Sequence, residues 1–490
     1  MSLLLTVDRQ ADDPVWKQIA NRVVTLVDDG TLVAGSRLPP SRTLAGTLGV
    51  NRSTVCRAYE ELWALGYLES RQGSYSTVRG RARPLSGSRV AAPPLVDWDR
   101  ACAPGVRDAC RRLAASPRPA AAGTGRIDFA NLTADTSLCP VDDLRRAVRH
   151  VLLQHGASLL DYGEPAGYAP LREVLARRLR GHGVTVSPDE ILITHGAQQA
   201  LELVLTLVAR PGASIAIEVP TYALILPLLQ VLDLRAVEIP LLPDGLDLQA
   251  LEAAFSREPP ALLYTMPNFQ NPTGITTSQA HRERLLSLCE AHAVPILEDG
   301  FEEEMKYFGK AVLPIKSMDR HGIVIYVGTF SKVIFPGLRV GWIAADRECI
   351  RRLVALNRCS ILSGSTLDQA AVHRFCEAGH YEKYLRRLHT VYRRRMQMLL
   401  KCLKLRMPAG RVAWTEPVGG CTLWLRVNGA RASDEAKIVE RAHREGVAVT
   451  PGSHFFSTPQ NGVGFRLSIA KAKVHEIDEG CRRLARAIRG

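Results

Sequence analysis

The chain alternates between two residue patterns from about residue 126 onward, and this alternation constrains the fold more than any other feature. Short apolar runs alternate with amphipathic stretches of helical period. The pattern predicts an α/β domain with a mostly parallel sheet and helices on both faces. The expected strands are Ile191–Thr194, Ser214–Val219, Ala236–Ile239, Ala261–Met266, Pro295–Leu297, Ile323–Val327 and Val340–Ala344. Because ligands of such sheets bind at the carboxyl ends of the strands, a site is expected there.

One strand end carries a lysine with a hydroxyl and an arginine near it. The run Ile323–Val327 leads into Gly328-Thr-Phe-Ser-Lys332, and Arg339 follows seven positions later. A lysine in this place suits a Schiff base with an aldehyde cofactor. Ser331 and Arg339 can bind a phosphate on the same cofactor, the arginine bidentately. Taken alone, Lys332 also fits a solvated loop lysine. The residues at the other strand ends are needed to choose between these two interpretations.

Four other strand ends carry residues that a phosphorylated heteroaromatic cofactor needs. They offer amides at a helix start for a phosphate, an aromatic face for a ring, an amide side chain and a carboxylate. Each also has a structural interpretation, as a turn, a core aromatic or a helix cap. Their common position at strand ends favours one shared site. The residues are Ala197 and Gln198, Tyr222, Asn271 and Asp299.

Composition limits the class of protein and its partners. The 490 residues carry a net charge of +14, which favours a polyanionic partner. The 11 cysteines are scattered and form no Cys-x-x-Cys pair, which indicates reduced thiols and no zinc site. No apolar run approaches the roughly 18 residues of a membrane span. We therefore expect a cytoplasmic protein without a membrane partner or a metal.

Three helices are expected near the N-terminus. Apolar residues from Trp16 to Val27 repeat at helical spacing. A short second helix is expected to start at Ser41 as its N-cap and to end at Gly49. The third spans 51–62 and buries Val55, Tyr59 and Leu62. Two short helices joined by a tight turn make a helix-turn-helix.

A hairpin is expected after the third helix, because 66–78 reads as two short strands that turn at Gln72-Gly73. Such a hairpin is a wing. Residues 37–89 hold nine arginines against three glutamates, and this basic segment coincides with the helical pattern. The coincidence favours DNA over a role of the charge in solubility alone.

The N-terminal segment 1–79 resembles the winged helix-turn-helix of the GntR family of bacterial regulators. The resemblance rests on Leu38-Pro-Pro-Ser-Arg42, on Leu48-Gly-Val-Asn-Arg52-Ser-Thr-Val55 and on Gly66-Tyr-Leu68. In this motif the N-terminal residues of the second helix of the pair contact base edges in the major groove. The residues expected to contact double-stranded DNA are Arg52, Ser53, Thr54 and Arg57 in the groove, Arg42 at the phosphates and Gly73 in the wing.

Residues 80–125 are expected to form a linker rich in proline, arginine and alanine, with a short helix near 106–115. The segment 126–490 resembles the fold-type I aminotransferases that use pyridoxal 5′-phosphate. The order of winged helix, linker and aminotransferase-like domain resembles the MocR subfamily of GntR regulators. A multidomain protein is therefore expected, with an α+β winged helix followed by an α/β cofactor-binding domain.

The resemblance assigns roles to the strand-end residues. It implies that Lys332 forms the internal aldimine, that Asp299 pairs with the pyridinium nitrogen and that Arg466 binds a ligand carboxylate. The remaining roles are implied in the same way. Asn271 contacts the ring oxygen, Tyr222 stacks on the ring, Ser331, Arg339, Ala197 and Gln198 hold the phosphate, and Tyr162 reaches the phosphate of a neighbouring subunit, which implies a homodimer.

The chain departs from the family pattern at one position. Phe301 stands where the family usually has a tyrosine that donates to the cofactor ring oxygen. Asn271, which many MocR regulators lack, is present. The ring oxygen is then held through Asn271 alone, so transamination is expected to be less efficient while cofactor binding is kept.

Three functions fit the sequence. The first is a transcription regulator that senses an amino compound or amino acid through an aldimine, with at most weak transaminase activity. The second is an active aminotransferase with an appended DNA-binding domain. The third is a regulator of vitamin B6 metabolism that senses the cofactor itself. The winged helix favours regulation. We expect a bacterial protein that associates with the nucleoid when it is bound to DNA. The motifs leave the effector and the operator open.

Overall fold

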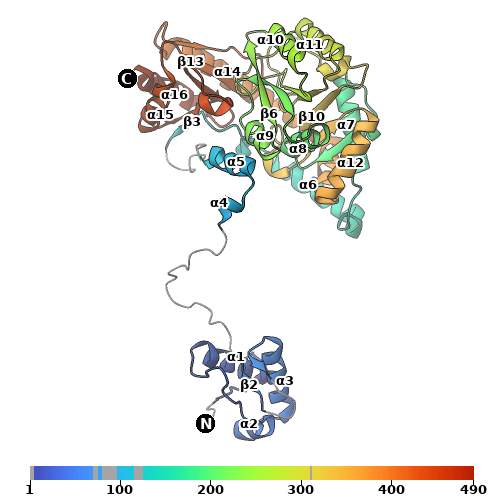
Figure 1. Ribbon diagram of the computed structural model, residues 1–490, viewed down its shortest axis with the longest axis vertical. Helices are drawn as coiled ribbons and strands as arrows, with labels where there is room; N and C mark the ends of the chain where they lie inside the picture. Colours follow the sequence, from blue (N-terminus) through green and yellow to red (C-terminus); the bar gives the residue numbers. More distant parts are fainter. Residues whose placement is uncertain (1–4, 70–74, 80–96, 115–124, 310–311, 490) are drawn as a thin grey trace. The chain divides into compact units, whose positions relative to one another are not determined.

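The computed structural model describes residues 5–69, 75–79, 97–114, 125–309 and 312–489. The chain divides into two compact units, Met1–Asp97 and Trp98–Gly490, and Figure 1 shows the elements of each. Gly73 and most of the expected linker lie outside the described residues. No helix within the described ranges is long and apolar enough to cross a membrane.

The first unit contains the three expected helices and the two strands of the expected hairpin. Their bounds are α1 Val15–Asp28, α2 Ser41–Leu48, α3 Arg52–Ala64, β1 Leu68–Glu69 and β2 Thr77–Val78. The two strands pair antiparallel. One core joins all three helices, because Ile19 and Val23 of α1, Leu44 of α2 and Val55 of α3 are buried together. The predicted helix-turn-helix architecture is confirmed.

Local capping explains where α2 and α3 begin and end. Gly49 ends α2 in the left-handed conformation, at φ +63°, which only glycine adopts at little cost. Asn51 caps α3, because its side chain accepts a hydrogen bond from the Ser53 amide. The expected N-cap role of Ser41 is wrong. Pro40 occupies that position, and Ser41 is the first residue of α2.

The second unit is built on an eight-stranded sheet in the order β4-β11-β10-β9-β8-β5-β6-β7. The strands from β10 to β6 run parallel, whereas β11 is antiparallel to both β10 and β4. The predicted mostly parallel sheet is confirmed. The strand bounds are β4 Ile191–Thr194, β5 Ser214–Val219, β6 Arg235–Leu242, β7 Gly245–Leu246, β8 Leu262–Thr265, β9 Ile296–Asp299, β10 Val324–Thr329 and β11 Gly341–Ala344.

Both faces of this sheet are buried, as alternate residues of one strand show. Ile215 and Ile217 of β5 belong to a core that includes α8, Ala197–Val208, and α9, Ile225–Val231. Ala216, between them, belongs to a second core with α10, Leu248–Arg257, and α11, Gln279–Ala291. Since successive side chains of a strand point to opposite faces, helices cover the sheet on both sides. We call this sheet and its helices the large lobe.

A second, smaller sheet forms the C-terminal part of the unit. Its strands run antiparallel in the order β12-β13-β16-β15. We call it, with its helices α15 and α16, the small lobe. The bounds are β12 Val412–Trp414, β13 Thr422–Val427, β15 Thr450–Pro451, β16 Val463–Ser468, α15 Glu435–Arg444 and α16 Val474–Arg489. A separate parallel pair joins β3, Ile127–Asp128, to β14, Val447–Ala448.

Helices complete the unit around the two lobes. The segment expected as linker contributes two of them, α4 Trp98–Ala101 and α5 Pro104–Ala114, and both belong to the second unit. The others are α6 Val141–His155, α7 Ala169–Gly181, α12 Arg347–Ile361, α13 Thr366–Glu377 and α14 His380–Arg406.

Candidate cofactor site and nucleic-acid interface

Lys332 lies just beyond β10, where the strand ends. Its ammonium group donates a hydrogen bond to the Leu132 carbonyl at 3.0 Å. Burial lowers the pKa of Lys332, and the nearby Glu302 carboxylate opposes that effect. A partly buried amine with a lowered pKa is available as the free base more readily than a surface lysine, which is what a nucleophilic lysine needs.

Asp299 ends the neighbouring strand β9 and is buried. One carboxylate oxygen accepts the Tyr264 hydroxyl at 2.9 Å, and the other accepts the Phe301 amide at 3.2 Å. Burial raises the pKa of Asp299 to about 6, although both hydrogen bonds act to lower it. The carboxyl group is therefore fixed in orientation and favours a cationic partner.

A candidate anion site lies where β4 runs into α8. The helix begins at Ala197 and Gln198, and its first amides have no intrahelical partner. The exposed Arg339 side chain donates to the His195 carbonyl at 2.6 Å. Gly196 has φ +86°, a backbone conformation that favours glycine, and a Cβ there would lie 2.9 Å from the Arg339 guanidinium. Helix amides and a guanidinium together suit a phosphate.

Ser331, the other expected phosphate ligand, lies beside Lys332 and is buried. Its hydroxyl accepts a hydrogen bond from Thr329 at 3.1 Å, and its amide donates to the same Thr329 oxygen. These contacts fix the turn that carries Lys332.

Tyr222 follows strand β5 and contacts the candidate anion site. Its hydroxyl donates to the Gln198 side chain at 3.1 Å. The ring is partly buried against the large-lobe core. An aromatic ring held in this way can stack on a planar ligand.

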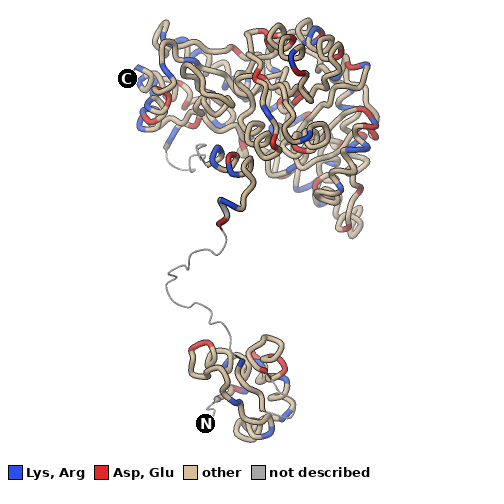
Figure 2. Tube along the Cα trace, viewed as in Figure 1, with Lys and Arg blue, Asp and Glu red and all other residues tan. Residues whose placement is uncertain are grey.

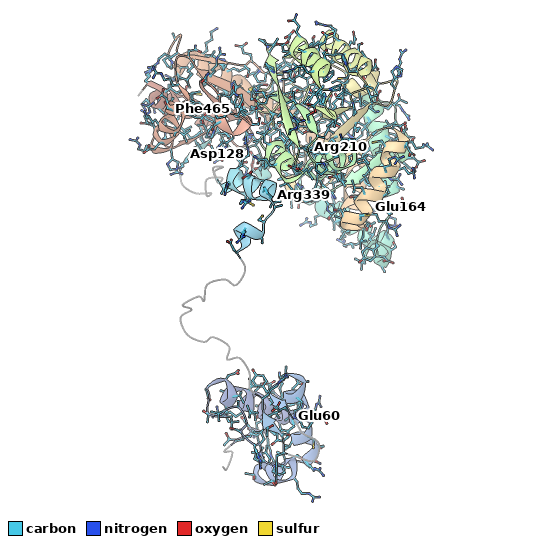
Figure 3. All side chains as sticks on the ribbon, viewed as in Figure 1. Glu60, Asp128, Glu164, Arg210, Arg339 and Phe465 are labelled. Atoms are coloured by element: carbon cyan, nitrogen blue, oxygen red, sulfur yellow. The ribbon has the colours of Figure 1, made fainter. Side chains whose placement is uncertain are left out.

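Arg466 approaches from the small lobe, on β16. Figure 3 labels its neighbour Phe465 there, and labels Arg339 in the large lobe. The Arg466 guanidinium donates to the Asn271 side chain at 3.2 Å, the Ala130 carbonyl at 2.8 Å and the Thr450 hydroxyl at 3.2 Å. All three acceptors are uncharged. Burial lowers the pKa of Arg466 to about 10.

The structure thus brings together most of the residues that the sequence singles out for the cofactor, and leaves one apart. Electrostatic effects on pKa values connect four of these residues, which are Lys332, Asp299, Tyr222 and Arg466. Arg339 also acts on the pKa of Tyr222. Tyr162 has a side chain that is 80% exposed. Its role at a neighbouring subunit stays a prediction.

The expected DNA contacts in the first unit lie at the start of α3 and on α2. Arg42, Arg52 and Ser53 are exposed, and Thr54 is partly buried. The Arg52 guanidinium donates to the Ser41 hydroxyl at 3.4 Å, which links the two helices of the motif. Ser53 donates its hydroxyl to Asn51 at 3.0 Å. Figure 2 marks the Lys and Arg positions of this unit in blue.

Arg57 has a second contact within the unit, because its guanidinium lies over the Trp16 ring at 4.3 Å. The cation–π contact holds part of this side chain against α1. Its role in base contacts stays a prediction, as does that of Arg42, Arg52, Ser53 and Thr54. Gly73, the expected wing residue, lies outside the described residues.

Two family matches divide the chain as the fold does. Residues 128–484 match the aminotransferase class I and II family, and residues 16–78 match the gntR family of bacterial regulatory proteins. The chain therefore belongs to the GntR regulators that carry an aminotransferase class I and II domain. The resemblance to the MocR regulators is confirmed.

Relatives match this fused regulator over nearly its whole length. The uncharacterized HTH-type transcriptional regulator YdfD of Bacillus subtilis (strain 168) is 30% identical over 95% of each chain. The probable rhizopine catabolism regulatory protein MocR of Rhizobium meliloti is 31% identical over 94% of this chain and 91% of its own. The crystal structure of the α-aminoadipate aminotransferase LysN of Thermus thermophilus matches with TM-score 0.73 and 32% identity, over 81% of this chain and 99% of its own.

The site of this GntR regulator fits pyridoxal phosphate. The amine of Lys332 suits the aldehyde of the cofactor, and the buried carboxylate of Asp299 suits its pyridinium nitrogen. The helix start after Gly196, beside Arg339, suits its phosphate. When bound, this cofactor supplies an electron sink for chemistry on amines. The protein's residues hold it in place and set the charge around it.

Several residues of the site give little sign of their role in the sequence. Tyr264 lies within a strand run, yet its hydroxyl reaches Asp299 on the neighbouring strand. A buried tyrosine needs a partner for its hydroxyl, which is the one general signal. Glu302 is buried three residues after Asp299 and accepts the Cys421 amide of the small lobe at 3.0 Å. Its charge acts on both Lys332 and Arg466.

Proposed function

We propose that this chain is a transcription regulator that binds DNA through its winged helix and senses an amino compound that also carries a carboxylate. Pyridoxal phosphate on Lys332 receives the amino group, and Arg466 receives the carboxylate. The protein acts in the cytoplasm, where its operator lies.

The observation that carries this proposal is the state of Arg466. The Arg466 side chain is partly buried, and it acts electrostatically on Lys332. Its Nε atom is buried and has no hydrogen-bond partner. Among the residues that the structure describes, no carboxylate forms an ion pair with it. The Glu302 carboxylate acts on Arg466 only through its charge, without a hydrogen bond to it. A guanidinium whose hydrogen-bond acceptors are all uncharged favours an anionic ligand. Because Arg466 and Lys332 act on each other electrostatically, one molecule that carries both a carboxylate and an amino group suits both residues.

We also infer that the protein works as a homodimer. The exposed Tyr162 supports this, and so do two exposed leucines near it in the sequence, Leu153 at 73% and Leu160 at 75% exposure. Large apolar side chains exposed to solvent favour an interface with a partner. In a second copy, Tyr162 would reach the phosphate of the neighbouring site.

The test measures DNA affinity in the presence of amino acids. The full chain, loaded with pyridoxal phosphate, is titrated onto DNA selected from a random pool, with each common L-amino acid and its decarboxylated amine as probes. We expect at least one amino acid to change the affinity by roughly 5- to 150-fold, the usual range of coupling between two sites. Its decarboxylated amine should change the affinity much less.

Arg466→Ala should abolish this response and leave DNA binding without the amino acid intact. Arg426→Ala is the matched control, because Arg426 is exposed on the adjacent strand β13. A response that survives in Arg466→Ala would show that this arginine is not the carboxylate clamp.

The same site also suits an active aminotransferase, since Lys332, Asp299 and Asn271 serve turnover as well as sensing. Multiple turnovers with an amino donor and a keto acid would favour that function over sensing alone. A DNA affinity that changes on addition of pyridoxal phosphate itself, with no amino acid, would favour the third function, in which the cofactor is the signal.

A further inference from the structure

Helix α5 lies in the segment between the two units, yet it packs tightly on the large lobe. It packs against α9, and Figure 1 shows the two helices together. A Cβ on Gly105 would overlap the Gln230 carbonyl of α9, so glycine is required for this close packing. Ala109, one turn further on, is buried. The helix is therefore a docked part of the second unit.

The C-terminal end of α5 also contacts the small lobe. Arg112 donates hydrogen bonds to the carbonyl oxygens of Phe456 and His454, on the segment between β15 and β16. We call residues 454–458 the junction segment. Its far end is held by the large lobe, because Glu238 of β6 accepts Ser457 at 2.6 Å and Thr458 at 2.8 Å. Three parts of the unit thus meet at this segment.

Phe455, near the start of the junction segment, reaches the ligand site. It is fully buried, and the Arg466 guanidinium lies over its ring at 5.3 Å. Its carbonyl accepts the Thr221 amide at 2.9 Å, next to Tyr222. The junction segment therefore contacts Arg466 and Thr221 at the ligand site, and it also contacts α5.

We propose that α5 carries the ligand signal toward the DNA-binding unit, with Arg112 as the residue that positions the junction segment. This inference rests on the proposed function, since it needs a ligand at Arg466. When a carboxylate binds Arg466, the guanidinium exchanges its uncharged acceptors for an anion. Phe455 packs directly against it and must adjust. The backbone carbonyls on either side of Phe455 are the acceptors of Arg112, so the adjustment reaches α5.

The contact between Arg112 and the junction segment matters for DNA binding because α5 lies next to the chain segment that leads to the winged helix. Residues 80–96 join it, through α4, to the winged helix. A change in how α5 is held changes the point from which the DNA-binding unit is tethered. Because coupling between two sites is reciprocal, DNA must change the affinity for the amino acid by the same factor.

The test uses the full chain with pyridoxal phosphate and, as probe, the L-amino acid that changes wild-type DNA affinity most. Arg112→Gln should keep the absorbance spectrum of the bound cofactor and the DNA affinity without probe. It should bind the probe several-fold more weakly and reduce the DNA response to less than about twofold, below the roughly fivefold lower bound of ordinary coupling. Arg112→Lys, which still donates to carbonyls, should restore part of the response.

Arg111→Gln is the matched control, because Arg111 is the preceding residue on α5 and its side chain is 74% exposed. Gly105→Ala is the second variant, since it displaces α5 from α9 without touching the ligand site. It should also uncouple the probe from DNA while the probe still changes the cofactor spectrum.

The outcomes separate the two proposals. If amino acids bind the wild type but none of them changes its DNA affinity, the proposed function itself is contradicted. A wild type that responds, with Arg112→Gln and Gly105→Ala responding equally, contradicts only the role of α5.

Discussion

The residues around Lys332 come from several strands, and from loops that follow them, which are far apart in the sequence. Those expected to contact DNA lie on two short, adjacent helices. Asp299, Tyr222 and Arg466 are held by hydrogen bonds or ring contacts from other elements. Arg42 and Arg52 are exposed. The first group is fixed by the fold before any ligand arrives, whereas the second is exposed to solvent and has few contacts within its unit.

Because one group of residues is held within the fold and the other is exposed, substitutions in the two groups should change free energies in different ways. Buried charged groups carry a large desolvation cost, so changing one has a large effect that depends on pH. Exposed arginines at a nucleic-acid surface are solvated without the partner, so their effect appears on binding and depends on salt. Substitutions in the two regions should therefore respond to different solution conditions.

Lys332→Ala tests the buried region most severely. We expect the purified variant to lose the visible absorbance of the bound cofactor, because the substitution removes the amine at the end of β10 that would hold it. Stabilisation by added pyridoxal phosphate in thermal unfolding should be lost as well. Lys437→Ala, at an exposed position on α15, is the control. A yellow Lys332→Ala protein, or a colourless wild type after addition of the cofactor, would contradict the site.

Asp299→Asn tests the electrostatic part of the same region in the apoprotein. Burial raises the pKa of Asp299 from 3.8 to about 6. Its stabilising contribution is therefore complete below pH 3.8 and is lost as the pH rises through about 6. One pKa unit corresponds to about 1.4 kcal/mol, so the wild type loses up to about 3 kcal/mol relative to the variant over this range.

Urea unfolding of both apoproteins between pH 4 and 8 measures the effect. The difference in unfolding free energy should grow in favour of the variant up to about pH 6 and stay constant above it. Glu252→Gln, at an exposed position on α10, should show no such trend. A difference that does not change with pH would mean that Asp299 is not a buried ionisable group in solution.

The sequence predicts those parts of both regions that depend on local pattern. All seven expected strands of the large lobe form, because alternation with helices and apolar runs determines them. The three N-terminal helices form for the same reason. The sequence misses contacts between distant segments. The partner of Asp299 is Tyr264, from another strand, and the partner of Arg57 is Trp16, from another helix.

The docking of α5 shows a further limit. Proline and alanine around this helix are typical of a linker. Its place on α9 depends on the missing side chain of Gly105, and in the sequence one glycine among 38 does not stand out. Ser41 is a similar case, since a favourable capping residue stands one position too late and Pro40 takes the cap.

Arg52→Ala tests the exposed region. Arg52 opens α3, where side chains reach base edges in the major groove. Its removal should weaken binding to the selected DNA by about 1–3 kcal/mol and relax the sequence preference at the contacted position. Competition with DNA variants at each position measures both effects. Arg22→Ala, which removes the same charge from an exposed position on α1, should leave the sequence preference intact.

Arg42→Ala is expected to have the smallest effect and the clearest dependence on salt. Arg42 is exposed in the first turn of α2, the helix that crosses the phosphates in this motif. A phosphate contact releases counter-ions, so its loss should weaken binding to all sequences alike and reduce the slope of log affinity against log salt by about 1. Affinity measured from low to physiological salt, on selected and on random DNA, gives both slopes. If Arg42→Ala instead changed the sequence preference while Arg52→Ala changed only the salt slope, α2 rather than α3 would face the bases, and the expected orientation of the motif would have to be reversed.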